Sequence, residues 1–467
     1  MRGENVKIRI GRDKMLLIMI YVLCSALGIM VGYYIRNTEF VVGWLGIITL
    51  INFVYAELLI YKFSEKILSF ANIFVVFLYL FHFGHVFILL FDQDHYFSNL
   101  DLEVLLGHNY FILSELFSLL FVTFCVTGVV WKLEKKHSFQ FQEIERCQIY
   151  NKNKLMFTGV FVILISFPIH LRISLQQIQM TAAGDYFDSF NINVSGLQSA
   201  ISSFLVMGII MIMLVFHKNR VILFVVYGIS VIYYAWTMMS GGRGHAVIAI
   251  MLLTFVLLKL IKISVWKLIA LFFVAYFVMK CLTAIAQIRN FGDINLEKVV
   301  SSMREVENPI VSTFEEFGGT QYTVGLVLKH SESNQYAFGT TYIESLVSIL
   351  PNINGIFTEI NKNAIFTLQL NEAYIGGSII GESYYNFGIF GFVVAYIIGV
   401  LVGKISVNVE RVIEEKSYNL LAYYVMPCFG VIWWIRDSFN SVCRNSIWAW
   451  LFIMFFYYIY DHIIKKE

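Results

Sequence analysis

The chain has 467 residues, of which 58% are hydrophobic, 17% are aromatic and only 14% are charged. Its mean hydropathy is +0.71, and no soluble core could bury that much apolar surface, so we predict a polytopic membrane protein. The formal net charge of +2 gives no excess of basic residues for binding nucleic acid. The four prolines and the lack of a low-complexity tract or long polar linker argue against separate soluble domains.

Apolar windows recur along almost the whole chain, each about 17 to 24 residues long, the length that a helix needs to cross a bilayer. A basic N-terminus precedes the first window and no clear small-residue cleavage site follows it, so we predict that this helix is retained. The sequence predicts an all-α protein with about twelve transmembrane helices, at 15–34, 40–61, 68–91, 109–131, 155–172, 196–216, 221–239, 246–263, 267–287, 384–403, 419–435 and 446–463.

The distribution of charge predicts which side of the membrane each loop occupies. With the N-terminus inside, every inner loop carries Lys or Arg, as in Lys62 with Lys66, and the positive-inside rule is satisfied. The alternate loops are acidic or polar. Both termini are therefore predicted to be cytoplasmic. The six cysteines fall mostly within predicted spans and lack CxxC spacing, so a disulfide framework is not expected.

A segment of about 95 residues, 288–383, contains no window long enough to cross and is predicted to lie outside. The chain thus divides into spans one to nine (1–287), a large extracytoplasmic loop with short helices (288–383) and spans ten to twelve (384–467). Within the loop, Thr341 to Leu350 followed by Pro351 has a mixed character. That pattern suits short helices that lie on the membrane face or fold over a cavity.

The outer segments contain arginines, against the positive-inside rule. Arginine suits phosphate because its planar guanidinium offers two parallel donors and stays charged. We therefore expect an anion to bind on this face. Arg36 and Arg172 are single, lie next to span ends and are interpreted as lipid anchors. The predicted outer arginines are Arg36, Arg172, Arg243, Arg289, Arg304, Arg436 and Arg444.

Two of these positions have local patterns that favour a diphosphate ligand. Arg243 lies in a Gly-rich turn, 240–245, that opens a predicted span, where helix N-terminal amides add partial positive charge. Arg436, Asn440 and Arg444 are four residues apart and would share one face if that stretch is helical. The alternatives are an anchor to lipid headgroups for Arg243, and an ion pair between Arg436 and Asp437 that caps a helix.

A second polar cluster precedes the tenth predicted span, where Glu382, Tyr385 and Asn386 share a helical face. A carboxylate at the edge of hydrocarbon is costly unless it is paired or used, so Glu382 is the leading general-base candidate. Its alternative role is that of a structural partner to an outer arginine. His245 is the alternative base, or else a helix-start residue. The acidic pair Asp92 and Asp94 is a weak metal signal, and we expect neither a metal nor a cofactor.

Several stretches of the second half resemble the Wzy-type oligosaccharide repeat-unit polymerases that build bacterial O-antigen and capsule. The resemblance covers most of the chain. It includes the large outer loop between late spans. The matching stretches are Gly241-Gly242-Arg243-Gly244, Phe314-Glu315-Glu316-Phe317-Gly318-Gly319-Thr320, Phe338-Gly339-Thr340-Thr341-Tyr342 leading to Leu350-Pro351, and Gly381-Glu382-Ser383-Tyr384-Tyr385-Asn386-Phe387-Gly388.

The resemblance implies a GT-C-like membrane glycosyltransferase that joins undecaprenyl-diphosphate-linked oligosaccharides at the outer face of the bacterial cytoplasmic membrane. A chain-length regulator is a candidate partner. On this hypothesis Glu382, with His245 as the alternative, is the base. The diphosphate is bound by Arg243, Arg289, Arg436 and Arg444. The glycan cavity is shaped by Arg304, Glu315, Glu316, Tyr342, Tyr385 and Asn386.

Three other functions compete with polymerisation. An O-antigen ligase or a polyprenyl-phosphate-sugar transferase would use similar lipid-linked donors, and a metal at Asp92 and Asp94 would favour the second. A flippase would move lipid-linked oligosaccharide without making bonds. Flippases bury charges in their bundles, whereas few charges, among them Glu57 and Lys280, lie within the predicted spans here.

Overall fold

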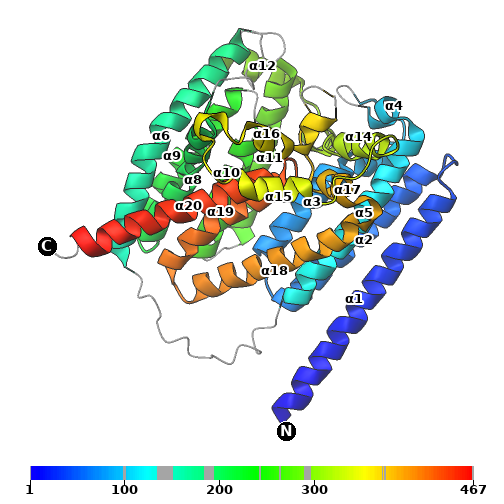
Figure 1. Cartoon of the computed structure of the whole chain (residues 1–467), viewed down its shortest axis with the longest axis horizontal. Coiled ribbons are helices and arrows are strands. Elements are labelled where there is room, and N and C mark those ends of the chain that lie inside the picture. The colour runs from blue at the N-terminus through cyan, green and yellow to red at the C-terminus, as the bar shows by residue number, and fades with distance from the viewer. Residues whose placement is uncertain are drawn as a thin grey trace.

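The computed structural model describes residues 2–97, 101–133, 151–183, 194–240, 243–261, 265–288, 296–370, 372 and 375–464. Every regular element among these residues is helical (Figure 1). The prediction of an all-α polytopic protein is confirmed to that extent.

The first part of the chain supplies most of the long helices. In order they are α1 (Arg2–Tyr34), α2 (Val41–Ser64), α3 (Phe70–Phe91), α4 (Leu102–Leu106), α5 (His108–Lys132), α6 (Lys152–Ala182), α7 (Gly196–Ser203), α8 (Leu205–Val215), α9 (Arg220–Thr237), η3 (Met238–Ser240), α10 (Gly244–Leu260) and α11 (Val265–Ile288).

Short helices follow, and three long ones close the chain. They are α12 (Leu296–Glu305), α13 (Pro309–Gly318), α14 (Gln321–Ser331), α15 (Thr340–Val347), η5 (Ile353–Gly355), α16 (Thr358–Asn363), η6 (Phe366–Gln369), α17 (Ile379–Phe387), η7 (Gly388–Phe390), α18 (Gly391–Glu414), α19 (Tyr418–Trp434), α20 (Phe439–Ile459) and η8 (Tyr460–Ile464).

Nine helical segments in the described ranges are long and apolar enough to cross a membrane. Each of the twelve predicted windows overlaps a helix, but those over α10, α11 and α19 are not among the nine. Since α10 and α19 have 17 residues each, they measure about 26 Å, short of the hydrocarbon thickness. The count of twelve therefore stays a prediction. The nine segments of the described ranges that are long and apolar enough to cross are Gly11–Tyr34, Val41–Ser64, Phe70–Phe91, His108–Lys132, Lys152–Ala182, Gly196–Val215, Arg220–Ser240, Ile379–Glu414 and Phe439–Ile464.

Helices α5 and α18, far apart in sequence, form the most extensive helix pair of the bundle (Figure 1). Their backbones approach closely because glycines face the contact. A Cβ on Gly399 would collide with the backbone of Cys125, and one on Gly128 would collide with that of Tyr396. Gly403, four residues after Gly399, continues the same stripe. This small-residue spacing is the usual device for close helix pairing in membranes, where packing replaces the hydrophobic effect.

A buried polar network joins four helices of the N-terminal part. Asn52 of α2 accepts hydrogen bonds from the hydroxyls of Tyr21 on α1 and Tyr79 on α3, and its amide donates to Ser25 and to Thr123 of α5. All five residues are buried. Because unsatisfied polar groups are costly in hydrocarbon, the network favours one arrangement of these helices.

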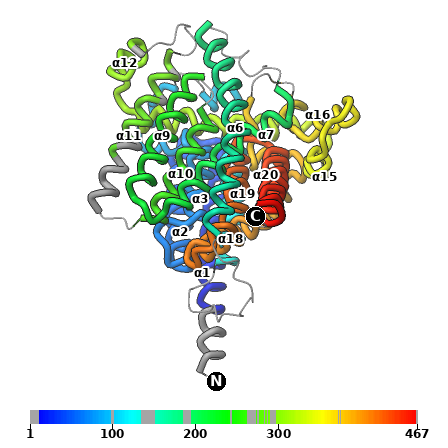
Figure 2. The backbone as a smooth tube through the Cα atoms, turned by 90° about the vertical axis from the view of Figure 1, so that its left-hand side faces the viewer, coloured from blue at the N-terminus to red at the C-terminus, as the bar shows by residue number. Residues whose placement is uncertain are grey.

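The segment 288–383 contributes to the bundle in two different ways. Its α13 packs on α3, where Phe317 stacks on Phe81 with ring centres 4.8 Å apart and a Cβ on Gly84 would collide with the backbone of Phe314. By contrast, α15 and α16 project sideways from the bundle beside α20 (Figure 2). The predicted long loop is therefore partly an integral layer of the fold and partly a lateral arm.

Candidate functional site

Two of the predicted diphosphate arginines, Arg243 and Arg436, lie next to each other although 193 positions separate them in sequence. Helix α10 begins at Gly244, as the Gly-rich turn predicts, and Arg243 occupies its N-cap position. A Cβ on Gly244 would lie 3.6 Å from Nη1 of Arg436. The Arg436 guanidinium also lies over the ring of Phe81, 5.7 Å from its centre. The fold thus brings the backbone of Arg243 and the guanidinium of Arg436 together at the start of α10.

Arg243 is buried and forms an ion pair with Glu316 of α13. Its side chain is 4% exposed, whereas that of Glu316 is 30% exposed. A carboxylate at this position compensates the charge of a buried guanidinium that would otherwise be costly. The pair does not support the interpretation of Arg243 as a lipid-headgroup anchor, because an anchor places its charged group at the surface.

His245 and Trp433 place an aromatic surface beside the two arginines. Their rings stack with centres 3.7 Å apart, and Phe429 extends the stack at 6.0 Å. His245 remains exposed in part, while a Cβ on Gly244 would lie 2.6 Å from the Trp433 ring. The site therefore combines two guanidiniums, an accessible imidazole and the N-terminus of α10, whose amides favour an anion.

The backbone preceding α17 passes close to Arg436. A Cβ on Gly376 would lie 3.5 Å from the Arg436 carbonyl oxygen, and one on Gly377 would collide with the backbone of Asp437. Thr323 of α14 donates a hydrogen bond of 2.8 Å to the Gly376 carbonyl. Glycine is required at position 377, because the backbone of Asp437 leaves no room there for a side chain.

Asp437 fixes the turn that carries Arg436. Its carboxylate accepts hydrogen bonds from the Ser441 hydroxyl at 2.6 Å, the Ser438 amide at 2.7 Å and the Trp433 indole. Burial raises the pKa of Asp437, although these donors and the charge of Arg436 oppose the shift. The predicted alternative, an ion pair between Arg436 and Asp437 that caps a helix, stays a prediction. The three bonds of Asp437 join the end of α19 to the first turn of α20.

The predicted common helical face of Arg436, Asn440 and Arg444 is wrong for Arg436. Helix α20 begins at Phe439, after the turn, so Arg436 is not on it. Asn440 and Arg444 do share a face, but both contact α15. The Ser348 hydroxyl bonds to Asn440, and Arg444 Nη2 donates to the Ser348 carbonyl at 3.1 Å. The helical premise failed because the turn at Asp437 interrupts the periodicity.

Glu382 of α17 is completely buried and accepts three hydrogen bonds. The donors are the Trp434 indole at 2.6 Å, the Phe439 amide at 2.9 Å and the Thr341 hydroxyl at 3.2 Å. The carboxylate thereby ties α17 to α15 and to both sides of the α19–α20 turn. This geometry supports the predicted structural alternative, although the partners are neutral donors and not an arginine.

We expect Glu382→Gln to fold and Glu382→Ala to be destabilised. The Trp434 and Phe439 donors share one carboxylate oxygen, which a glutamine carbonyl replaces, whereas alanine leaves two buried donors unsatisfied and costs about 3 kcal/mol. Thermal unfolding of both variants in detergent measures this difference. A Glu382→Gln protein that is stable and yet inactive would instead return Glu382 to the candidates for the base.

The predicted glycan-cavity residues are distributed over several places. Tyr342 bonds to Ser383 at 3.1 Å and the Asn386 amide donates to Thr341 at 2.7 Å, so both join α15 to α17. The Tyr385 ring lies 5.9 Å from that of Phe366. Among these residues, Glu316 pairs with Arg243.

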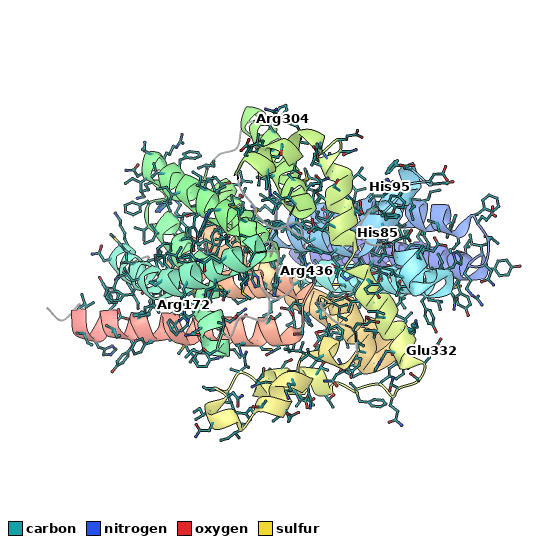
Figure 3. All side chains as sticks on the ribbon, turned by 90° about the horizontal axis from the view of Figure 1, so that it is seen from above. His85, His95, Arg172, Arg304, Glu332 and Arg436 are labelled. Atoms are coloured by element: carbon teal, nitrogen blue, oxygen red, sulfur yellow. The ribbon has the colours of Figure 1, made fainter. Side chains whose placement is uncertain are left out.

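Glu315, the neighbour of Glu316, is directed toward α3 and the segment that follows it. Its backbone carbonyl accepts a hydrogen bond from His85 at 3.0 Å, and its carboxylate lies 3.9 Å from His95. Arg304 is exposed on α12 at the edge of the molecule, and Arg172 lies on α6 to one side, whereas Arg436 lies near the middle (Figure 3). Arg289 lies outside the described residues.

Two further sequence interpretations concern Arg36 and the acidic pair. Arg36 is stacked on Tyr33 at 4.1 Å, beside the end of α1, which fits an anchor. Asp92 is largely exposed and bonds to His95 at 3.3 Å. Across the ranges that the structure describes, no three His, Cys, Asp or Glu side chains are grouped to hold a metal ion. Independence from metal remains a prediction.

Trp433 and the pairing of Arg243 with Glu316 were not predicted. Trp433 has no sequence signal beyond the general enrichment of tryptophan near membrane interfaces. Glu316 lies in one of the stretches that carry the family resemblance, but its partner comes from an element 73 residues away in sequence.

These features define an integral membrane protein of many helices with a buried arginine site at the junction of α10 with the α19–α20 turn. The chain belongs to the O-antigen polysaccharide polymerase Wzy family, whose model matches residues 16–467. Membership makes it a multi-pass protein of the bacterial inner membrane that polymerises lipid-linked oligosaccharide repeat units. No curated protein and no solved structure matches the chain.

Proposed function

We propose that the protein joins undecaprenyl-diphosphate-linked repeat units into O-antigen or capsule at the outer face of the membrane, with both termini in the cytoplasm. The observation that supports a diphosphate substrate most directly is the meeting of Arg243 and Arg436 at the N-terminus of α10. Guanidinium pairs and helix N-termini are the groups that proteins use for phosphates. The remaining helices form a GT-C-like frame around this site.

The donor in this reaction is the growing chain on its lipid diphosphate. The bond between the anomeric carbon and the diphosphate oxygen breaks, and the same carbon forms a bond to a hydroxyl of the incoming unit. Negative charge develops on the leaving diphosphate, where Arg243 and Arg436 stabilise it by positioned donors. The hydroxyl proton passes to a general base. Transfer requires no oxidant or further co-reactant.

His245 is the better-placed base of the two that the sequence suggests. A general base must reach the acceptor hydroxyl; Glu382 has no exposed surface and three hydrogen bonds, whereas His245 is exposed in part beside the arginines. Glu382 then acts as a positioning residue for the turn that carries Arg436. Glu316 holds Arg243 in place and contributes to the wall of the glycan cavity.

The test is elongation by purified protein in vesicles supplied with a lipid-linked repeat unit. We expect a ladder of longer lipid-linked glycans, also in the presence of EDTA, and we expect none from vesicles without the protein. Translocation of intact units without a ladder would instead identify a flippase. Transfer only to a different acceptor, such as lipid A, would identify a ligase. Loss of the ladder on chelation would contradict the metal-independent mechanism.

A further inference from the structure

Helix α15 turns polar side chains toward the bundle and apolar side chains outward, the opposite of a surface helix in water. Thr341, Ser345 and Ser348 are buried against the bundle, whereas Ile343 and Leu346 are 62% and 53% exposed. A surface helix of a soluble protein turns its apolar stripe inward. The outward apolar stripe therefore indicates a surrounding that is itself apolar.

The exposed apolar row continues beyond the end of α15. Leu350, Ile353 and Ile356 are all more than half exposed, on both sides of the turn at Pro351. Glu344, the charged residue of α15, is half-buried, and its carboxylate accepts a hydrogen bond from Asn363 of α16 at 3.3 Å. Glu359 and Lys362, on α16, form an exposed ion pair at 3.0 Å. The exposed apolar side chains of the arm thus precede its exposed ion pair along the chain.

The arm, which comprises α15 and α16, is attached along the side of the membrane-spanning helix α20 and not at its end. The Ile349 carbonyl accepts a hydrogen bond of 3.0 Å from the Trp448 indole, and the Ser348 carbonyl accepts one from Arg444. Trp448 is nine residues into α20, which places it about 14 Å along the helix axis from Phe439. The attachment point therefore lies within the first half of a span.

The surface beside the arm is one that faces lipid. On α20, Leu451, Met454 and Phe455 are each more than half exposed. Figure 2 shows α15 and α16 extending sideways from the bundle next to α20, so the arm does not fold over the bundle as a cover. The apolar row of the arm continues the exposed apolar surface of the bundle.

We propose that the apolar row of residues 343–356 is seated among the acyl chains of the leaflet at which α20 begins. The arm is then an interfacial element, with its reversed polarity explained by hydrocarbon on its outer side. This inference follows from the membrane fold and does not depend on the reaction proposed above. It selects the membrane-face alternative for the segment that starts at Thr341.

The arm is also coupled to the arginine site through hydrogen bonds. Thr341 donates to Glu382, which accepts from Trp434 and Phe439 on either side of the turn that contains Arg436. Through Glu382 the arm is therefore connected to α17 and to the turn that carries Arg436, where a lipid diphosphate is proposed to bind.

The test places the photoreactive residue benzoylphenylalanine at position 343 or 353 of the full chain. The protein is reconstituted in vesicles of phosphatidylethanolamine and phosphatidylglycerol, irradiated and analysed by mass spectrometry for phospholipid adducts. Position 451 on α20 is the lipid-facing control and position 362 on α16 is the water-facing control. We expect adducts at 343 and 353 comparable to those at 451, and roughly tenfold more than at 362.

Two results would overturn the proposal. The first is an adduct at 451 with none at 343 and 353, which would place the row in water or under protein. The second is cross-linking of 343 or 353 to another copy of the chain, which would make the row a protein interface. Positions 343 and 353 lie on different sides of Pro351. If the variant at one position does not fold, the variant at the other still tests the proposal.

Discussion

Substitution of Arg243 by lysine is expected to lower the elongation rate roughly 100-fold, the usual cost of losing one positioned donor to a developing anion. Lysine keeps the charge and can still pair with Glu316, so the fold should be retained. It lacks the planar fork that binds two phosphate oxygens at once. The measurement is the rate of ladder formation at saturating lipid-linked substrate, together with thermal unfolding of the variant.

Arg436→Lys should give a loss of similar size, since both arginines lie at the start of α10. The matched control is Arg36→Lys, which changes another arginine near a span end, stacked on Tyr33 and away from the site. Its elongation rate should equal that of the parent protein. Normal elongation by both Arg243→Lys and Arg436→Lys would show that point charges suffice and would remove the bidentate diphosphate contact from the mechanism.

Replacement of His245 by alanine is expected to lower the elongation rate by roughly 100-fold or more, the range for loss of a general base. The ring is stacked on Trp433 and exposed in part, so its removal leaves a space beside the arginines. Added imidazole should restore part of the rate. The measurement is elongation as a function of imidazole concentration and of pH.

The sign of the pH effect follows from the chemistry. Only the neutral imidazole accepts a proton, and desolvation lowers the pKa of His245 to about 4. The parent rate should therefore fall as pH decreases toward that value, and His245→Ala should lose that acidic limb. A structural role would give neither imidazole rescue nor a changed pH profile. His245→Ala with full activity, combined with a folded and inactive Glu382→Gln, would transfer the role of base to Glu382.

The sequence predicted the positions of the long helices well because apolar length and flanking charges are local properties. The Gly-rich turn 240–245 was predicted to open the span at 246–263, and α10 begins at Gly244. The tenth span was placed at 384, but α17 begins at Ile379, with Ser378 as its N-cap, and continues through Gly388 into α18. Hydropathy alone did not detect this start because Gly381, Glu382 and Ser383 are polar or small.

The sequence predicted some of the arginines of the candidate site but not the contacts that they make. Arginines on the wrong side of the charge rule identified Arg243 and Arg436, because charge placement is visible along the chain. Their contact, the pairing with Glu316 and the burial of Glu382 depend on which helices pack together, and no local pattern contains that information. The helical face proposed for Arg436 failed at a single turn that Asp437 stabilises.

The backbone contact between α5 and α18 has a mechanical consequence. Because Gly399 and Gly128 leave no gap, neither helix can slide without collision, so we expect this pair to behave as a fixed spine during turnover. Helix α17 leads directly into that spine, whereas α15 and the α19–α20 turn are attached to α17 by hydrogen bonds at Glu382. Any displacement of α15 or of the α19–α20 turn relative to this pair would therefore have to break the hydrogen bonds at Glu382.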